Sequence, residues 1–398
     1  MRVLHIITGL GAGGAEQQLR LLLRHLPARC DVVTLTNPGV VAHGIRADGT
    51  RVTHLGMRSN RDASALPRLV HLIRTGGYDL VHTHLYRACV FGRTAARLAG
   101  VRSVIATEHS LGRAVMEGRP LTRSVRALYL ATERLGSATV AVSATIADRL
   151  RSWGVPAARV HLVPNGIDAD RFRFDPAART AARTRLGIPG NTFVVGGVGR
   201  LVPGKQFDVL VRAVAGLPQA RLVLVGDGPE RAPLRELAGR LGAADRVHLL
   251  GERDGVVEAS GDRPSDIPQL LAAMDVFASP STEESFGLAV VEALAAGLPV
   301  VHVTCPAVDE LPPSAAPGAR RIGHGTPAMT AALREHAVGW RPRLPVPPAV
   351  QRYGIARSAE RLMALYERTA APGPGCCLPG AGPALDLPST TAVSDPKR

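Results

Sequence analysis

Short apolar runs alternate with longer amphipathic stretches along most of the chain. This alternation predicts α/β domains built on parallel sheets, because strands buried on both faces carry continuous apolar runs. In the first half of the chain we expect strands at residues 2–8, 31–36, 51–56, 79–84, 103–109 and 139–143, followed by a last short strand and loop at 159–168. In the second half we expect strands at residues 192–200, 220–228, 246–252, 275–281 and 298–304.

The two series of strands predict two consecutive doubly wound, Rossmann-like domains with a ligand-binding cleft between them. A polar stretch interrupts the alternation after the first series. We therefore place the first domain at residues 1–168 and the second at residues 169–354.

The C-terminal part of the chain divides into two segments. Residues 355–370 predict a helix with an apolar stripe formed by Leu362, Leu365 and Tyr366. Residues 371–398 are rich in proline and glycine and show no periodicity, so we expect a disordered tail there.

The chain has 398 residues and a formal net charge of +15, which makes nucleic acid a partner to consider. The arginines are dispersed, however, and no nucleic-acid-binding motif accompanies them, so we do not expect nucleic acid as a partner. A nucleoside-diphosphate substrate and anionic membrane lipids explain the charge better.

Cysteine spacing and hydropathy bear on the location of the protein. The five cysteines lack the spacing of zinc ligands, which indicates free thiols in a reducing compartment. The sequence has no apolar run of about 18 residues, the length that a membrane-spanning helix needs. We therefore expect a cytoplasmic protein, with peripheral contact at the inner membrane face as an open alternative.

A glycine-rich loop follows the first expected strand. Gly9, Gly11 and Gly14 match the G-x-G-x-x-G pattern of dinucleotide sites. The second expected strand ends without the acid that binds a nicotinamide cofactor's ribose, which disfavours that class. Gly13 and Gly14 can still present a helix N-terminus to another phosphorylated or sugar ligand. A tight turn without any ligand remains the alternative.

Two basic residues follow the first strand of the second series. Arg200 and Lys205 lie at the carboxyl edge of the expected sheet, where open α/β sheets bind ligands. Lys205 is one of only two lysines in the chain, so its compact ammonium suggests a site that a guanidinium does not fit. Together the two side chains can neutralise a diphosphate, although a chance position of the lysine stays open.

Two glutamates near the end of the second sheet form a further candidate pair. Glu284 is expected in a loop, and Glu292 about two turns into the following helix, near the same edge. Burying a carboxylate among apolar residues costs free energy unless it accepts hydrogen bonds, for example from sugar hydroxyls. The alternative is a pair of solvated side chains.

Other constellations point more weakly to chemistry. Asp168 and Asp170 spell the D-x-D of metal-dependent transferases, but their position in a connection favours a turn. His82 and His84 share one face of a strand and have no carboxylate partner in sequence, which favours packing or cleft lining. We expect no bound metal and no cofactor.

Taken together, the sequence resembles glycosyltransferase family 4, the retaining nucleotide-sugar transferases of GT-B fold. The resemblance covers roughly residues 1–305 and rests on these stretches in family order: GAGGAE (11–16), EH (108–109), PNGID (164–168), GRLVPGK (199–205), VGDGP (225–229) and PSTEESFGLAVVEALAAGLPVV (280–301). It also implies that the helix at 355–370 crosses back onto the first domain.

The resemblance implies a role for each matching residue. Arg200 and Lys205 would hold the donor diphosphate, and Glu292 would bind the nucleotide ribose. The transferred sugar would be held by Glu284, which is expected to be catalytic, and by the backbone amides of Phe286, Gly287 and Leu288. His109, the second expected catalytic residue, would reach that sugar from the first domain. Gly13 and Gly14 would contact the donor, at its diphosphate, or the acceptor.

The implied reaction is transfer of a sugar from a nucleoside diphosphate to an acceptor hydroxyl, with retention and without a metal. Its setting would be cell-surface glycan or secondary-metabolite biosynthesis. A nucleotide-sugar epimerase and a non-catalytic nucleotide-sugar-binding protein remain alternatives.

Three segments depart from the family pattern or lie outside it. Residues 251–275 look extended, and residues 302–325 lack a Gly-Gly-x-x-Glu loop, of which Glu310 would be a remnant. Residues 110–136 carry five arginines beside apolar positions at helical spacing. This last segment suits an acidic acceptor or a membrane surface, or else a core-packed helix with a solvated basic face.

Overall fold

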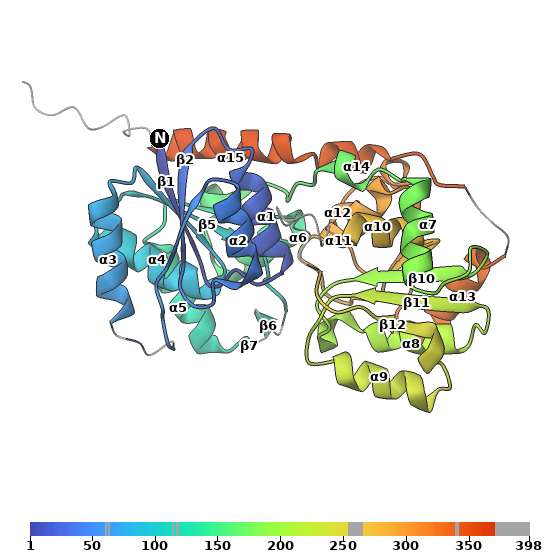
Figure 1. The fold of residues 1–398 in the computed structure, drawn as a ribbon. Helices are drawn as coiled ribbons and strands as arrows, with labels where there is room; N and C mark the ends of the chain where they lie inside the picture. Colours follow the sequence, from blue (N-terminus) through green and yellow to red (C-terminus); the bar gives the residue numbers. More distant parts are fainter. Residues whose placement is uncertain are drawn as a thin grey trace, which may run out of the picture.

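The computed structural model describes residues 1–59, 62, 64–113, 115–116, 119–253, 266–338 and 342–370. Two parallel sheets stand side by side, each flanked by helices (Figure 1). The first sheet has seven strands in the order β3-β2-β1-β4-β5-β8-β9, and the second has six in the order β12-β11-β10-β13-β14-β15. The prediction of two doubly wound α/β domains is therefore confirmed.

Both faces of the first sheet are buried. Its strands are β1 (Arg2–Ile7), β2 (Arg29–Thr34), β3 (Arg51–His54), β4 (Leu80–His84), β5 (Ser103–Glu108), β8 (Ala138–Ala141) and β9 (Val160–Leu162). Its helices are α1 (Gly14–Leu23), α2 (Gly39–Ala47), α3 (Ala65–Gly76), α4 (Tyr86–Leu98), α5 (Arg123–Glu133) and α6 (Ala144–Trp153). Alternate residues of β1 enter different clusters: Leu4 and Ile6 pack with α3 and α4, whereas Val3 packs with the C-terminal helix.

The second sheet repeats this layout. Its strands are β10 (Phe193–Val198), β11 (Ala220–Val225), β12 (Val247–Leu249), β13 (Val276–Ser279), β14 (Val300–His302) and β15 (Ala319–Arg321). Its helices are α7 (Pro176–Arg185), α8 (Phe207–Ala215), α9 (Arg231–Arg240), α10 (Asp266–Ala273), α11 (Leu288–Ala295), α12 (Pro306–Asp309) and α13 (Thr326–His336). Helices α14 (Pro348–Arg352) and α15 (Ile355–Ala370) end the described chain.

The polar stretch after the first domain contains a helix, α7, with a buried anchor. Asp275 binds Arg179 at 2.6 Å and Arg183 at 2.7 Å, and it also accepts the Val194 N–H at 2.8 Å. One carboxylate thus ties α7 to the start of β10. This helix was not expected, because its apolar face consists only of alanines.

The chain crosses between the domains twice, and the two crossings are bonded to each other. The Ile167 N–H donates to Tyr353 O at 2.8 Å, and the Ile355 N–H donates to Ile167 O at 3.0 Å. A Cβ at Gly166 would stand 2.6 Å from Cα of Ile355, so only glycine permits this approach. The glycine of the PNGID motif therefore serves the junction between the crossings.

Helix α15 returns to the first domain and lies along it (Figure 1). Leu362, Leu365 and Tyr366 are buried against Val3, Leu80 and Ile105 of three neighbouring strands, together with further apolar side chains. The apolar stripe read from the sequence is thus the packed face. The expected tail, residues 371–398, lies outside the described residues.

Candidate active site

The N-termini of two helices, one from each domain, meet between the carboxyl edges of the sheets. A Cβ built on Gly14 of α1 would lie 3.5 Å from Leu288 Cδ1, the first residue of α11. Neither N-cap residue, Gly13 or Gly287, supplies a side-chain cap. Two helix N-termini with positive dipole ends and no side-chain cap from their N-cap residues thus converge, which favours an anion between them.

Glu16 lies close to these N–H groups. Its carboxylate folds back against Gly13, where a Cβ would collide with it. Burial raises the pKa of Glu16 to about 7, with Arg200 lowering it and Glu252 raising it. Arg200 and Glu252 belong to the second domain, so charges from the second domain act on this carboxylate of the first. Neither Glu16 nor Glu252 was assigned a role from the sequence.

Lys205 and Glu284 form an ion pair. Lys205 ends a short 3-10 turn after β10, and Glu284 lies in the loop before α11, as expected. Their side chains keep 25% and 15% of their exposure, so the pair lies at the surface of the cleft. The two residues were assigned to neighbouring parts of one donor, and the structure brings them into direct contact.

Glu292 is nearer to the helix N-terminus than the sequence suggested. Because α11 begins at Leu288, Glu292 lies about one turn into the helix, and the expectation of two turns was wrong. Burial raises the pKa of Glu292 to about 7, and Arg171 partly offsets this effect. A half-buried carboxylate with such a pKa gains from hydrogen-bond donors such as sugar hydroxyls.

The loop between Glu284 and Glu292 is held from behind. Phe286 is buried, with its ring centroid 5.0 Å from that of Tyr353. Gly287 has a φ of 101°, and the Cys305 side chain occupies the space that its Cβ would need. Only glycine fits there, and the chain then enters α11 at Leu288 without a side-chain cap from Gly287.

His109 follows β5 directly and belongs to a histidine cluster. Its Nε2 lies 3.1 Å from Nδ1 of His84, whose Nε2 lies 3.1 Å from Nδ1 of His5. Burial lowers the pKa of His109 to about 4. His82 and His84 line this interior as expected, whereas His5 was missed because it stands alone in the apolar run of β1.

The D-x-D pair is a turn on the surface. Asp168 precedes a 3-10 helix, η2 (Ala169–Phe172), without capping it through its side chain, and Asp170 forms a 3.0 Å ion pair with Arg173. Within the described residues, metal-ligand geometry is found for His5, His82 and His84, and not for these aspartates.

Glu310, expected as the remnant of a Gly-Gly-x-x-Glu loop, contacts the first domain. Its carboxylate accepts the N–H groups of Ala144 at 2.9 Å and Thr145 at 2.7 Å, the first residues of α6. Glu283 of the second domain likewise accepts the backbone N–H of Arg113 of the first, at 2.9 Å. Both acids therefore hold the two domains together through backbone N–H groups.

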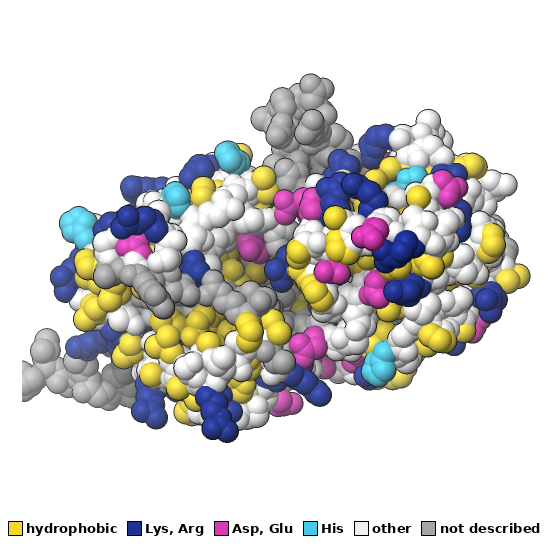
Figure 2. All heavy atoms as spheres, turned by 90° about the horizontal axis from the view of Figure 1, so that it is seen from below, with side chains coloured by type: hydrophobic (Ala, Val, Ile, Leu, Met, Phe, Trp, Pro, Cys, Tyr) yellow, Lys and Arg dark blue, Asp and Glu magenta, His cyan; other side chains and the backbone are white. Residues whose placement is uncertain are grey.

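The arginines of the 110–136 segment are not equivalent. Arg126 donates to the carbonyls of Ser152 at 3.0 Å and Trp153 at 2.8 Å, at the end of α6. Arg123 is exposed at the start of α5, and the side chain of Arg119 lies outside the described residues. Figure 2 shows basic and acidic side chains interspersed over both domains on one face.

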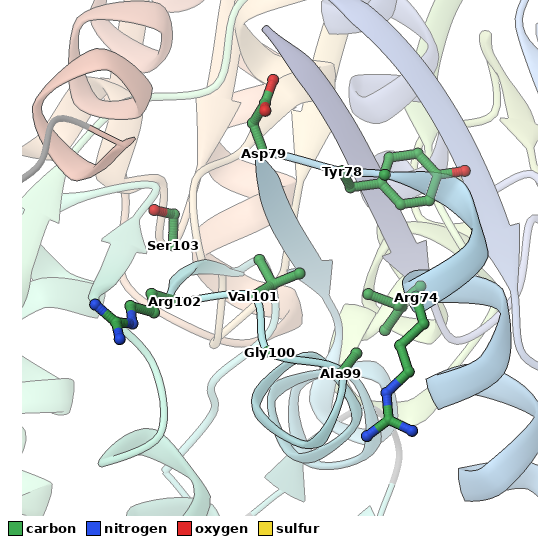
Figure 3. Close-up of a pocket in the computed structure, with 10 residues that line it drawn as sticks. Arg74, Tyr78, Asp79, Ala99, Gly100, Val101, Arg102 and Ser103 are labelled. Atoms are coloured by element: carbon green, nitrogen blue, oxygen red, sulfur yellow. The ribbon is translucent and has the colours of Figure 1, made fainter.

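A hollow of about 400 Å³ lies elsewhere, at the amino edge of the first sheet (Figure 3). Two of its polar side chains are engaged: Arg74 donates to Leu98 O at 2.6 Å, and Asp79 accepts the Arg2 N–H at 2.6 Å. Because this edge is opposite to the converging helix N-termini, the hollow has no part in the site above.

Comparison with known proteins agrees with this geometry. Residues 12–171 match the model described as Glycosyltransferase Family 4, and residues 178–312 match Glycosyl transferases group 1. The chain is 32% identical over 290 residues to the 2-deoxystreptamine glucosyltransferase of Streptomyces kanamyceticus, covering 68% of this chain and 72% of that protein. The chain belongs to glycosyltransferase family 4. The resemblance inferred from the motifs is therefore confirmed.

Other relatives of this glycosyltransferase-family chain are matched over less of their length. A D-inositol 3-phosphate glycosyltransferase of Salinispora tropica is 32% identical over 72% of this chain and 60% of its own. A GDP-mannose-dependent alpha-(1-6)-phosphatidylinositol monomannoside mannosyltransferase of Mycobacterium tuberculosis is 36% identical over 52% of this chain and 53% of its own. The chain thus spans little more than half the length of these two relatives.

Solved structures confirm the GT-B fold class for this family member. Anabaena Alr3699/HepE in complex with UDP and glucose superposes with a TM-score of 0.78 at 23% identity, covering 92% of this chain and 100% of that one. The glycosyltransferase WaaG superposes with a TM-score of 0.64 at 19% identity, covering 92% and 98%. Within the described residues, no helix is both long and apolar enough to cross a bilayer.

Proposed function

We propose that this chain is a retaining glycosyltransferase that moves a sugar from a nucleoside diphosphate to an acceptor hydroxyl. The observation that carries the proposal is the convergence of the α1 and α11 N-termini beside Arg200 and Lys205. Such a site favours an anion with two charged groups, as a diphosphate has. The names of relatives that transfer glucose or mannose support the same reaction class.

The Lys205–Glu284 pair is the part of the site that responds to the donor. When a diphosphate enters, Lys205 exchanges the Glu284 carboxylate for phosphate oxygens. The carboxylate is then free to accept hydrogen bonds from the sugar hydroxyls beside the amides of the 286–288 loop. Donor binding thus replaces one internal ion pair by two contacts to the ligand, which orients the sugar over the diphosphate.

In the transfer step the acceptor oxygen forms a bond to the anomeric carbon as the bond to the phosphate oxygen breaks. The departing phosphate oxygen takes the acceptor's proton on the same face, so the configuration is kept. Arg200, Lys205 and the two helix N-termini stabilise the charge that grows on the leaving group. These groups supply positive charge without a metal, so we expect activity to survive EDTA.

Neighbouring groups complete the proposed site. Glu292, about one turn into α11, would accept the hydroxyls of the nucleotide ribose. His109 would contact the transferred sugar from the first domain. Acceptor choice would lie in the first domain, which holds the 110–136 segment. We propose a cytoplasmic location for this reaction, with cell-surface glycan or secondary-metabolite biosynthesis as its setting.

A donor screen tests the proposal. Nucleoside-diphosphate hexoses are added one at a time, and the melting temperature is measured, because a ligand of the folded state raises it. The stabilising donor is then incubated with D-inositol 3-phosphate, 2-deoxystreptamine and phosphatidylinositol monomannoside, the acceptors in the relatives' names. A new glycoside with the donor's anomeric configuration, seen by NMR, is the expected result.

Other outcomes would overturn it. An inverted product would exclude retention, and an epimerised donor without transfer would favour an epimerase. Donor binding that is unaffected by Glu284→Gln, with no turnover of any acceptor, would favour a binding protein. Activity lost to EDTA and restored by magnesium or manganese would exclude the metal-independent step.

A further inference from the structure

Four histidines from three neighbouring segments lie together inside the first domain. His5 on β1 is paired in register with His82 on β4, and His84 is two residues further along β4. These three side chains have no exposure, and His109 follows the adjacent strand β5. Strand geometry places His5, His82 and His84 on one face of the sheet, under α15.

Three of the rings form a hydrogen-bonded line. His109 Nε2 contacts His84 Nδ1 at 3.1 Å, and His84 Nε2 contacts His5 Nδ1 at 3.1 Å. His84 thus uses both ring nitrogens inside the line. The line begins at the carboxyl edge of the sheet, at His109, and ends in the middle of β1, at His5.

The groups that face this line are neutral. His82 lies beside it, with ring centroids 4.1 Å from His84 and 5.3 Å from His5. Its own nitrogens contact the hydroxyls of Tyr366 at 2.6 Å and Thr107 at 2.7 Å. Burial lowers the pKa of all four histidines, so each ring carries a single proton near neutral pH.

A neutral imidazole has one N–H and one lone pair, so each contact in the line needs one of each. The three tautomers are therefore linked, and only two arrangements satisfy both contacts. In one, the outer proton is on His109 Nδ1 and His5 Nε2 is bare. In the other, His5 Nε2 carries the proton and His109 Nδ1 is bare.

Both ends of the line lack a partner. His5 Nε2 and His109 Nδ1 are buried and have no hydrogen-bond partner among the described residues. One end must hold an unpaired N–H in either arrangement, and an unpaired buried N–H is the costlier defect. His5 is enclosed inside the sheet, whereas His109 is partly exposed at the edge that faces the second domain. Of the two rings, only that of His109 keeps any exposure toward a ligand, although its Nδ1 is covered in the unliganded structure.

We propose that His5 and His84 are positioning residues that hold His109 as the Nδ1–H tautomer, ready to donate a hydrogen bond to a sugar oxygen. His5 donates its Nδ1–H to His84 Nε2, and His84 donates its Nδ1–H to His109 Nε2. An oxygen of the bound sugar then accepts a hydrogen bond from His109 Nδ1–H, the one N–H of the line that otherwise has no partner. The sugar contact rests on the proposed function, whereas the tautomer of His109 does not.

The same rings also match a metal site, since ligand atoms of His5, His82 and His84 lie within 4.8 Å of one another. A divalent ion would have to break the contacts of His82 to Tyr366 or Thr107. It would also bring charge into a pocket where these rings contact no carboxylate. The hydrogen-bonded line explains the observed contacts without that cost, and the test separates the two.

The first measurement is of the unliganded wild-type protein, labelled with ¹⁵N in its histidines. Long-range ¹H–¹⁵N correlations distinguish a protonated from a bare ring nitrogen, and His109→Gln assigns its signals. We expect His109 protonated at Nδ1 and bare at Nε2 at pH 7.5. A His109 protonated at Nε2 or at both nitrogens would overturn the proposal, whether or not the protein transfers sugar.

Variants of His5 supply the second measurement. His5→Leu removes the donor to His84, so we expect His109 to become a mixture of tautomers and turnover to fall roughly tenfold, the scale of one hydrogen bond. His5→Asn keeps an amide donor near the position of Nδ1, so we expect the Nδ1–H tautomer and most of the turnover to return. His71→Leu, at an exposed position on α3, is the matched control.

The outcomes are distinct. If His5→Leu and His5→Asn lose turnover equally while His109 keeps its tautomer, His5 has only a packing role. Stoichiometric binding of Zn²⁺ or Co²⁺ to the wild type, lost in His5→Leu, would show a metal site instead. If the wild type transfers no sugar but His109 is the Nδ1–H tautomer, the proposed function fails and the positioning role of His5 and His84 stands.

Discussion

At the residue scale, Lys205 is held in position by its ion pair with a carboxylate. Lys205 reaches Glu284, and its Cε lies 3.7 Å from the point where a Cβ of Gly199 would stand. The methylene chain of Lys205 thus passes over Gly199 and places the ammonium group beside Glu284, which belongs to another loop. A guanidinium is wider and planar, so it fits this path less well.

Substitution of Lys205 should therefore lower turnover. We expect Lys205→Ala to reduce it about 10²–10³-fold, the range for loss of one electrostatic donor to a leaving group. Lys205→Arg should also lose turnover despite its charge. Initial rates at saturating donor measure the effect, with Arg212→Ala, an exposed change on α8, as control. Wild-type rates in Lys205→Ala would remove Lys205 from the diphosphate site.

Glu16 predicts a pH dependence of donor binding. Its pKa is raised to about 7, so the carboxylate is ionised at pH 8 and repels a diphosphate at the α1 N-terminus. At pH 6 it is mostly neutral, and the repulsion is gone. We expect Glu16→Gln to bind donor several-fold more tightly than wild type at pH 8 and equally well at pH 6. Calorimetric titration at both pH values measures this.

The control for this change is Glu236→Gln, an exposed acid on α9. Glu292 titrates in the same range, but its carboxylate would accept ribose hydroxyls and so act in the opposite direction. It is present in both proteins, so it cancels in the comparison of wild type with Glu16→Gln. Equal affinities of the two proteins at pH 8 would contradict the role of Glu16.

Single residues of the site were predictable where their type and spacing matched a motif. Arg200, Lys205 and Glu284 are found in that way. Contacts between distant positions were not, because neither Glu16 beside Arg200 nor His5 beside His84 leaves any periodic trace. Their burial decides their chemistry, and burial depends on the folded chain.

At the element scale, the strands that were predicted are those with an apolar run in the sequence, including the partly exposed β3, β9 and β12. Strand β15 and the hairpin β6 (Val115–Met116) and β7 (Arg119–Pro120) were missed. Each is only two or three residues long and has no apolar run to indicate it. Helix α7 escaped detection because ion pairs, not apolar residues, attach it.

Helix α15 should be required for folding. It buries Ile355, Leu362, Leu365 and Tyr366, and each large apolar side chain contributes about 1.5–3 kcal/mol on burial. Their sum is comparable to the stability of a whole domain. We expect a chain ending at Gly354 to be unfolded or aggregated, as seen by circular dichroism. A folded, active protein of that length would contradict the assignment.

The matched control is a chain that ends at Ala370, the last residue of α15. Its melting temperature and activity should equal those of the full chain, because residues 371–398 offer no periodic apolar face. A milder change, Leu365→Ala, should cost about 2–5 kcal/mol of unfolding free energy. Denaturant titration measures that loss.

Helix α5 carries arginines of two kinds, which allows stability and binding to be separated. Arg126 donates to two carbonyls at the end of α6, so Arg126→Gln should lose roughly 1–3 kcal/mol of stability. Arg123 and Arg134 are exposed. We expect Arg123→Gln with Arg134→Gln to keep the melting temperature and donor affinity but to weaken binding to anionic liposomes or raise the acceptor KM. If neither liposome binding nor the acceptor KM changes, Arg123 and Arg134 only form a solvated basic face.

At the scale of the whole molecule, the buried histidines make the fold sensitive to acid. The pKa is lowered to about 3 for His5 and to about 4 for His109, and it is well below 6.5 for His82 and His84. The unfolded chain takes up these protons near pH 6.5. The folded chain does so near pH 3 at His5, near pH 4 at His109 and well below pH 6.5 at His82 and His84. The stability they provide is thus complete above pH 6.5 and lost as the pH falls.

Each such histidine changes the unfolding free energy by about 1.4 kcal/mol per pH unit within that window. Glu16 and Glu292 oppose this between about pH 4.5 and 7, since their raised pKa values favour folding as the pH falls. Four histidines outweigh two acids, so we expect the melting temperature to drop steeply below pH 6. In His5→Asn the drop should be shallower, and in His71→Asn unchanged. A wild-type melting temperature that is constant from pH 7.5 to 5 would contradict this account.

The bonded pair of crossings determines how the two domains can move. One covalent connection would allow both twisting and bending, but two connections joined at Ile167 and Gly354 resist twisting. The remaining degree of freedom is rotation about a pivot through that junction. The N-termini of α1 and α11 would then move apart and together along one arc about this junction. They would meet again in the same alignment after every product leaves.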